Sequence, residues 1–150
     1  MKITIASIGG RAAGKAFEEL ATLYMDRIAP YAAIDSLSFR SEAALHLHVD
    51  RMRRRTAPLL VLLDSRGRSF QSEEFAAWLG RQRDAGQQAL VFAIGPPDGW
   101  TAAARGQAQM LLAFGPMTLP HELVTVVVAE QIYRAFTILA GHPYHSGHTG

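Results

Sequence analysis

Apolar and polar positions alternate along this chain in a pattern that predicts strands and helices in turn. Short apolar runs, typical of strands buried within a sheet, recur through the sequence. They predict strands over residues 2–8, 34–39, 59–63, 89–94 and 109–114. Between them, apolar residues spaced three and four apart predict helices over 15–29, 42–55, 101–107 and 123–139, with a further helix that has Ser72 as N-cap and ends at Gly86. Alternating strands and helices indicate an α/β fold, so we expect a mostly parallel sheet flanked by helices.

The last predicted helix is apolar around nearly its whole circumference. Its apolar positions are 123, 124, 126–129, 132, 133, 135, 136, 138 and 139. A membrane span is disfavoured because Glu130 and Arg134 lie in the middle, where each charge would cost about 2.5–3.5 kcal/mol. Two interpretations stay open: a central core helix, or a helix covered in part by a second subunit.

Length and composition indicate one domain over residues 1–150. The chain is 49% hydrophobic and 19% charged, which is typical of a globular protein. It has no cysteine, so disulfides, thiolate zinc sites and a cysteine nucleophile are excluded. Residues 1–5 lack the long apolar stretch of a signal peptide, and we expect a cytoplasmic protein without membrane association.

The charge balance is mildly basic, with a formal net charge of +2. Arginines gather at Arg51, Arg53, Arg54 and Arg55. This run is either the solvated face of a helix or an electrostatic contact surface for nucleic acid. A partner rich in phosphate is therefore compatible with the sequence but not required by it.

Three segments rich in glycine, proline or charge follow predicted strands, which is where ligands bind in open α/β sheets. They cover residues 64–68, 95–100 and 115–120. None matches a Rossmann or Walker phosphate-binding motif. They predict either rigid loops that hold a neutral or zwitterionic, adenosine-containing cofactor through backbone hydrogen bonds, or simple tight turns.

Titratable side chains gather at the final helix and at both of its ends. Glu130 and Arg134 have the i, i+4 spacing of a helical salt bridge, and many such pairs are only structural. Leu119-Pro120-His121 precedes the helix and His142-Pro143-Tyr144-His145 follows it. Reactive groups that bracket a rigid element favour an enzyme.

These segments resemble the large-subunit ribosomal RNA methyltransferase H family, within the SPOUT class of knotted methyltransferases. The resemblance is carried by Leu119-Pro120-His121, by Val128-Ala129-Glu130-Gln131-Ile132-Tyr133-Arg134-Ala135 and by His142-Pro143-Tyr144-His145, in that order. It implies a homodimer and a C-terminal trefoil knot, which the usual rule against knotted chains would not predict. It also implies that the three loops hold S-adenosylmethionine. The implied cofactor residues are Leu63, Gly95, Phe114, Gly115, Pro116, Met117, Thr118 and Leu119.

The substrate implied by the resemblance is a pseudouridine in large-subunit (23S) ribosomal RNA, methylated at ring N3 within the assembled ribosome. No metal is needed, because the sulfonium of the cofactor already activates the methyl group and the protein has to align the attacking nitrogen and help remove its proton. The residues expected around the substrate are His121, Glu130, Arg134, Tyr144 and His145. We expect Arg134 to hold phosphate or stabilise negative charge, Tyr144 to stack on or hydrogen-bond the base, and His145 to move the proton.

Two positions depart from the family pattern and keep alternatives open. Pro96 stands where relatives commonly have a second glycine, which removes one backbone N–H from a cofactor loop. Ser146 stands where relatives often have Arg or Lys. The first departure allows a ribosome-binding or assembly module that has lost cofactor binding. A metal-dependent hydrolase built on His142, His145 and His148 is a further alternative, although that tail supplies no acidic ligand.

Overall fold

A parallel sheet forms the centre of this protein. The computed structural model describes residues 1–9 and 14–146. Within them, the strands are β1 (Lys2–Ile8), β2 (Ala33–Phe39), β3 (Leu59–Ser69), β4 (Ala89–Ile94) and β5 (Met110–Ala113). They pair in the order β2-β1-β4-β3-β5, and every pairing is parallel. The predicted parallel α/β fold is confirmed; this order is compatible with the trefoil knot, which stays a prediction.

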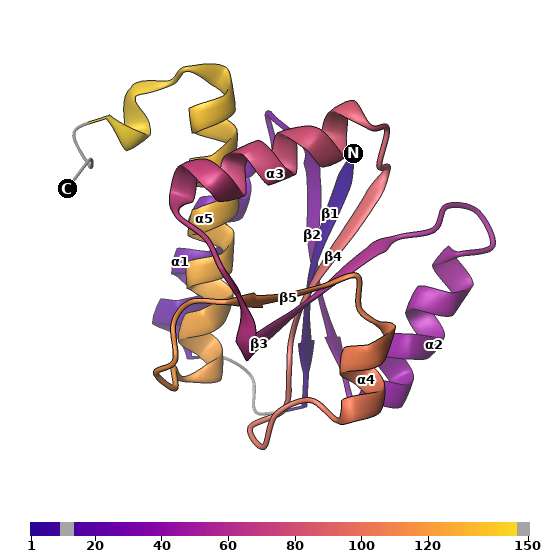
Figure 1. Cartoon of the computed structure of the whole chain (residues 1–150). Coiled ribbons are helices and arrows are strands. Elements are labelled where there is room, and N and C mark those ends of the chain that lie inside the picture. The colour runs from indigo at the N-terminus through magenta and orange to yellow at the C-terminus, as the bar shows by residue number, and fades with distance from the viewer. Residues whose placement is uncertain (10–13, 147–150) are drawn as a thin grey trace.

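Helices cover both faces of the sheet (Figure 1). They are α1 (Lys15–Ile28), α2 (Glu42–Met52), α3 (Ser72–Asp84), α4 (Ala102–Gln107), α5 (His121–Ala140) and the short 3-10 helix η1 (Pro143–His145). Ile28 of α1, Leu79 of α3 and Ile132 of α5 join one buried cluster. Leu45 of α2 and Ala104 of α4 join a second cluster on the opposite face.

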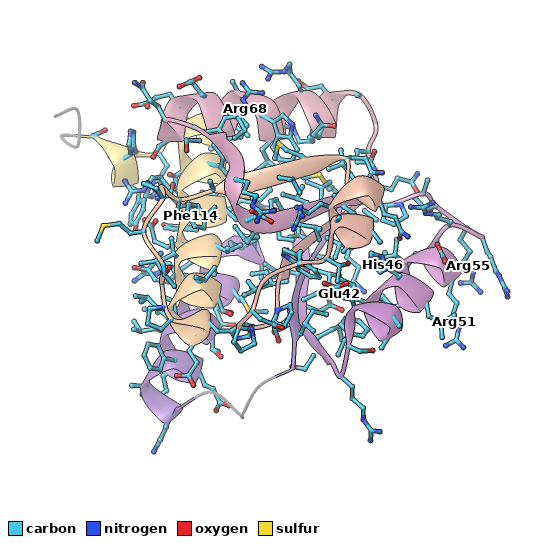
Figure 2. All side chains as sticks on the ribbon, turned by 60° about the horizontal axis from the view of Figure 1, so that its bottom comes forward. Glu42, His46, Arg51, Arg55, Arg68 and Phe114 are labelled. Atoms are coloured by element: carbon cyan, nitrogen blue, oxygen red, sulfur yellow. The ribbon has the colours of Figure 1, made fainter. Side chains whose placement is uncertain are left out.

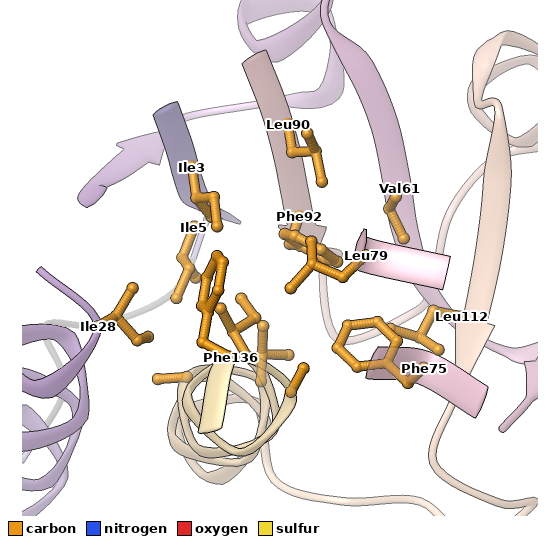
Figure 3. Close-up of a cluster of buried hydrophobic side chains, with 14 of the residues drawn as sticks. Ile3, Ile5, Ile28, Val61, Phe75, Leu79, Leu90, Phe92, Leu112 and Phe136 are labelled. Carbon is orange, nitrogen blue, oxygen red and sulfur yellow. The ribbon is translucent and has the colours of Figure 1, made fainter. Parts of the chain in front are cut away.

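Strand β4 lies between these two clusters, and all of its residues are buried. Leu90 and Phe92 point into the first cluster, and Val91 and Ala93 into the second. Figure 3 shows Phe136 of α5 projecting toward the strand residues of the first cluster. Burial on both faces explains why residues 89–94 form a continuous apolar run instead of an alternating one.

Helix α5 is a core helix of the first face, packed against α1 and α3. Val128, Ala129 and Ile132 are almost completely buried. By length and composition α5 could cross a membrane, but core helices pass the same test, and 39% of its apolar window is buried inside this protein. The core-helix interpretation is supported, and additional cover by a second subunit stays a prediction.

The helix predicted over residues 42–55 ends earlier, at Met52. The N–H groups of Arg54 and Arg55 bond carbonyls three residues back, at 3.3 and 3.0 Å, so the chain tightens into turns. Pro58 then favours an extended backbone before β3. The prediction that this helix continues to residue 55 was wrong because local turns ended it.

The N-cap of α3 also differs from the prediction. It is Gln71 and not Ser72, which is the first helical residue. The Glu74 carboxylate accepts the Gln71 backbone N–H at 3.2 Å, which satisfies a donor at the helix start. Gln71 therefore closes the helix start by a capping contact that the serine pattern did not indicate.

Strand β3 runs past the predicted end at Leu63 and continues to Ser69 through a bulge. Leu63 and Arg68 both lie opposite Leu112 of β5, so residues 64–67 are the extra segment. A Cβ on Gly67 would lie 2.5 Å from the carbonyl carbon of Leu111. Only glycine allows the bulge to approach β5 this closely. The predicted loop 64–68 is thus a bulged part of the strand.

We expect Gly67→Ala to lower the free energy of unfolding by about 1–3 kcal/mol, because the new methyl group overlaps backbone that cannot move aside cheaply. Urea denaturation at equilibrium measures the change. Gly106→Ala is the matched control: no atom lies within 4 Å of a Cβ there, and replacing a helical glycine should stabilise by about 0.5–1 kcal/mol. Equal effects of the two substitutions would contradict the role given to Gly67.

Candidate functional site

A cavity of about 630 Å³ opens at the bulge of β3 and at the carboxyl ends of β4 and β5. Its walls come from the bulge of β3, the loop 95–100 and the chain from β5 into α5, so the three predicted segments meet at one place. Seven of the eight predicted cofactor residues line it: Leu63, Gly95, Phe114, Gly115, Met117, Thr118 and Leu119. Pro116 belongs to the same segment but does not line the cavity.

The cavity walls are mainly apolar, with a few charged groups. Ile94, Leu112 and Val124 add apolar surface to the predicted residues, and Asp64 and Asp98 add carboxylates. Small-ligand sites commonly combine an apolar wall with a few polar groups that fix orientation. The sequence places the Asp64 carboxylate in one of the three candidate segments, whereas nothing in the sequence singled out Asp98.

Trp100 is the largest wall residue that sequence reasoning missed. Its indole Nε1–H donates to the Leu63 carbonyl oxygen at 3.0 Å, which ties the loop after β4 to the start of the bulge in β3. A Cβ on Gly95 would lie 2.8 Å from the indole ring, so glycine is required there for the ring to sit close. Arg105 Nη1 donates to the Trp100 carbonyl oxygen at 2.5 Å. No local signal could reveal a contact with Leu63, which lies 37 residues away in the chain.

The loop 95–100 is braced from two sides. The Gly99 N–H donates to the Pro96 carbonyl at 2.9 Å, in a turn where Gly99 has a φ of +86°. The Glu42 carboxylate of α2 accepts the Thr101 backbone N–H at 2.9 Å and its hydroxyl at 2.7 Å. Pro96 lacks an N–H for a ligand, but its carbonyl closes this turn, so the departure from the family pattern leaves an ordered loop.

His121 is the first residue of α5, and it lines this cavity and a second one of about 890 Å³ beside α1. Its Nε2 atom is buried and makes no hydrogen bond within the described residues. A buried polar atom without a partner costs free energy, which a donor or acceptor on a ligand would offset. Among the five predicted catalytic residues, His121 is therefore the one placed beside the cavity.

The other four predicted catalytic residues form one cluster at the opposite end of α5. Arg134 donates from Nε and Nη2 to Glu130 Oε1, at 3.0 and 2.5 Å. The Tyr144 hydroxyl donates to the same oxygen at 3.0 Å. His145 Nδ1 lies 2.9 Å from Arg134 Nη1, and the Arg134 guanidinium lies 4.9 Å from the centre of the Tyr144 ring. We call these four residues the Arg134 cluster.

Gly141 makes this cluster possible by reversing the chain after α5. Its φ of +69° is a left-handed conformation that favours glycine, and the next N–H, from His142, donates to the Thr137 carbonyl at 2.9 Å. The tail then returns along the helix, where the Tyr144 ring packs on the Tyr133 ring with centres 4.6 Å apart. The two sequence motifs that flank Gly141 are thereby brought into contact.

The electrostatics of the cluster assign Tyr144 a donor role. Burial raises the pKa of the Tyr144 hydroxyl well above its usual value, and the neighbouring Tyr24 and Glu130 raise it further. The hydroxyl therefore stays protonated near neutral pH and donates to Glu130. It is not suited to remove a proton from a substrate.

The single chain does not bring all five predicted catalytic residues around one pocket. His121 and Arg134 are 13 positions apart on the same helix, which corresponds to about 20 Å at 1.5 Å per residue. Figure 1 shows η1 and the β5–α5 connection at opposite ends of α5. The cavity and the Arg134 cluster are therefore two separate regions of one chain.

The histidine tail does not assemble as a metal site in the part of the chain that the structure describes. His142 Nδ1 accepts the Tyr144 N–H at 3.1 Å, and His145 contacts Arg134 and Glu73. No group of three or more His, Cys, Asp or Glu side chains suited to a metal occurs among the described residues. His148 lies outside them.

The basic run at the end of α2 is exposed on the surface. Figure 2 shows Arg51 and Arg55 projecting away from the helix into solvent. Arg53 Nε lies 3.9 Å from an Asp50 carboxylate oxygen, an ion pair at the surface that contributes little to stability. Both sequence interpretations, a solvated face and a nucleic-acid contact, are compatible with this exposure.

Fold and cavity together define the class of the protein: an open parallel α/β protein with a small-ligand site at the carboxyl edge of its sheet. Similarity to known proteins assigns the chain to a family within this class. A family described as Predicted SPOUT methyltransferase matches residues 1–145. A Koribacter versatilis protein named Ribosomal RNA large subunit methyltransferase H is 49% identical over 148 residues, covering 99% of this chain and 100% of that protein.

Two further similarities agree with this family assignment. A protein of the same name from Xanthobacter autotrophicus is 43% identical, covering 97% of this chain and 99% of its own. A solved structure of a probable methylase family protein from Haemophilus influenzae has the same fold, with a TM-score of 0.54 at 11% identity over 95% of this chain and 68% of that one. This chain belongs to the SPOUT methyltransferase family and, within it, to the large-subunit ribosomal RNA methyltransferase H family. The resemblance seen in the motifs is confirmed, while the roles of the individual site residues stay predictions.

Proposed function

We propose that this protein transfers a methyl group from S-adenosylmethionine to N3 of a pseudouridine in 23S ribosomal RNA, within the assembled ribosome. Family membership makes it a SPOUT methyltransferase of ribosomal RNA that uses S-adenosylmethionine. The observation that carries the proposal is the cavity where three loops meet and seven implied cofactor residues form the lining. We expect residues 1–150 to act as one domain in the cytoplasm, where ribosomes work.

The cavity matches S-adenosylmethionine in size and chemistry. Its volume of about 630 Å³ is within the range common for small ligands. Leu63, Phe114 and Leu119 offer apolar surface for the adenine ring, and the Asp98 carboxylate can accept hydrogen bonds from ribose hydroxyls. The missing Cβ at Gly95 keeps the Trp100 wall close to the backbone. When bound, the cofactor supplies a methyl group already activated by its sulfonium.

Arg134 is suited to hold the negative charge of the substrate. Of its five guanidinium N–H donors, two bond Glu130 and one faces His145, which leaves two outside these contacts among the described residues. They can bind an RNA phosphate or stabilise the negative charge that develops when N3 loses its proton. Tyr144, held protonated, can donate to the base or stack on it.

We further propose a homodimer in which the Arg134 cluster of one protomer faces the cavity of its partner. The separation of about 20 Å within one chain supports this, because a single base cannot reach both regions. Leu20 and Leu23 lie one turn apart on α1, beside α5, and are 43% and 42% exposed. Met117, at the cavity, is 81% exposed. Exposed apolar surface of this kind is typical of protein interfaces.

The exposed arginines at the end of α2 also support RNA as the substrate. Arg51, Arg54 and Arg55 have no carboxylate partner within the described residues, so their charge is available to RNA phosphates. Phosphate contacts position a protein on RNA without reading its sequence. The selection of one nucleotide would then depend on the cavity region and on the surrounding ribosome.

The proposal is tested by methyl transfer from labelled S-adenosylmethionine to whole ribosomes, isolated large subunits and naked rRNA, with the product nucleoside identified by mass spectrometry. We expect N3-methylpseudouridine from ribosomes and no label in naked rRNA. Absence of label in every substrate would contradict the proposed reaction. Ribosome binding without measurable affinity for the cofactor would instead favour the assembly module.

Arg134→Ala should lower methyl transfer at least 100-fold, a loss typical of removing a group that stabilises developing charge. The affinity for S-adenosylmethionine, measured by calorimetry, should change less than about twofold, because Arg134 is proposed to act on the RNA and is not among the residues that line the cavity. Arg83→Ala is the matched control, since Arg83 is exposed on α3 and pairs only with Asp84 in the described structure. Equal loss of activity and cofactor affinity would mean that Arg134 acts through the fold.

The dimer predicts a molecular mass of about twice that of one 16.4 kDa chain by light scattering at micromolar concentration. The double substitution Leu20→Glu and Leu23→Glu should shift the mass toward the monomer, because it places charge on apolar contact surface. Leu47→Glu is the control, since Leu47 is 52% exposed but lies on α2, on the other face of the sheet. A monomeric wild-type protein with full activity would refute this part of the proposal.

A further inference from the structure

Glu73 connects helix α3 to the C-terminal tail, although neither its sequence position nor the family motifs single it out. Its Oε1 atom lies 2.8 Å from His145 Nε2, a contact between residues 72 positions apart. His145 Nδ1, on the other side of the ring, lies 2.9 Å from Arg134 Nη1. The His145 side chain is only 16% exposed, so the ring is held between a carboxylate and a guanidinium.

This arrangement determines which ring nitrogen of His145 carries the proton. A guanidinium has only donors and no acceptor, so a hydrogen bond between Arg134 and Nδ1 requires a lone pair on Nδ1. The proton of the neutral ring must then lie on Nε2, where it donates to the Glu73 carboxylate. The hydrogen bond from His145 also lowers the pKa of the Glu73 carboxyl group, which keeps that acceptor ionised.

The His145 ring, held in one orientation, in turn orients the Arg134 guanidinium. The guanidinium is bound at Nε and Nη2 by Glu130 and at Nη1 by His145. Its plane and the direction of its two remaining donors are therefore determined by contacts at both ends of the group. If His145 adopted the other tautomer, its Nδ1–H would point at Arg134 Nη1, and two donors would face each other.

We propose that Glu73 is a positioning residue of the methyl-transfer site: it holds His145 in the Nε2–H tautomer, and His145 then orients Arg134 toward the substrate. The catalytic part of this inference rests on the proposed function, but the tautomer does not. A role for His145 in moving the substrate proton requires its contact with Arg134 to open first, because the Nδ1 lone pair is used there.

Glu74 provides a matched control on the same turn of α3. Its carboxylate accepts the Gln71 N–H at the helix start and makes no hydrogen bond or ion pair with the tail or with α5 within the described residues. Glu74→Ala therefore removes a carboxylate and weakens the helix cap, but leaves the contacts of His145 intact. It separates an effect on the stability of α3 from an effect on the tail.

The test is ¹⁵N nuclear magnetic resonance of the full-length protein labelled at histidine, with the His145 signals assigned by loss in His145→Gln. At pH above 7.5, we expect a protonated Nε2 and an unprotonated Nδ1 for His145. Glu73→Ala should give a mixture of tautomers. Glu73→Gln should restore the single tautomer, because the amide oxygen still accepts from Nε2–H. Glu74→Ala should leave the His145 signals unchanged.

The same variants are then compared in methyl transfer. Glu73→Ala should lower kcat roughly tenfold, as expected for a catalytic group that is present but less well oriented, with little change in KM for S-adenosylmethionine. Glu73→Gln should recover most of this loss. The proposal is overturned if wild-type His145 shows an Nδ1–H or mixed tautomer, or if Glu73→Ala leaves its signals unchanged. It is also overturned if kcat does not fall in Glu73→Ala and recover in Glu73→Gln. Should no methyl transfer occur with the wild type, the proposed function fails, and the spectra still decide the tautomer.

Discussion

Burial of α5 is the constraint on which both the cavity and the Arg134 cluster depend. A helix that is apolar around most of its circumference must be covered, and α1 and α3 cover it on one face of the sheet. Its position then determines where its polar residues lie. His121 begins the helix at the cavity wall, and Arg134 lies about 20 Å further along. One rigid element therefore carries a residue of the cavity wall and the central residue of the Arg134 cluster, and it holds them apart.

In the Arg134 cluster, an ion pair with the common i, i+4 spacing of a helix is held in one geometry by further hydrogen bonds. Glu130 and Arg134 are each 17% exposed in their side chains, so neither charge is well solvated. Partly buried charges are tolerated when they are paired and hydrogen-bonded, and here Tyr144, His145 and Glu73 complete the bonding. The tail that supplies two of these partners is returned to the helix by the left-handed turn at Gly141. The geometry of the guanidinium is thus a property of three chain segments together.

Sequence patterns predicted most of the fold because burial on both faces of a strand and on the inner side of a helix leaves a regular apolar pattern. The strands 2–8 and 89–94 were predicted with the bounds that the structure has. The segments 64–68, 95–100 and 115–120 were identified because each follows a predicted strand, and ligand sites in parallel α/β sheets lie at that edge. Their meeting at one cavity agrees with that rule. The motif residues 130, 134, 144 and 145 were likewise named from the chain and lie together.

Contacts between distant segments leave no periodic pattern in the sequence. Only the tertiary structure determines which of these contacts form. The extension of β3 depends on the approach of Gly67 to Leu111, and the cavity wall depends on the bond from Trp100 to Leu63. Glu73 looks like an ordinary acidic residue in the first turn of a helix until the tail places His145 beside it. The separation of His121 from the Arg134 cluster follows from the length of α5. Local patterns record which side chains are buried, whereas hydrogen bonds between single atoms depend on how the buried elements are finally packed.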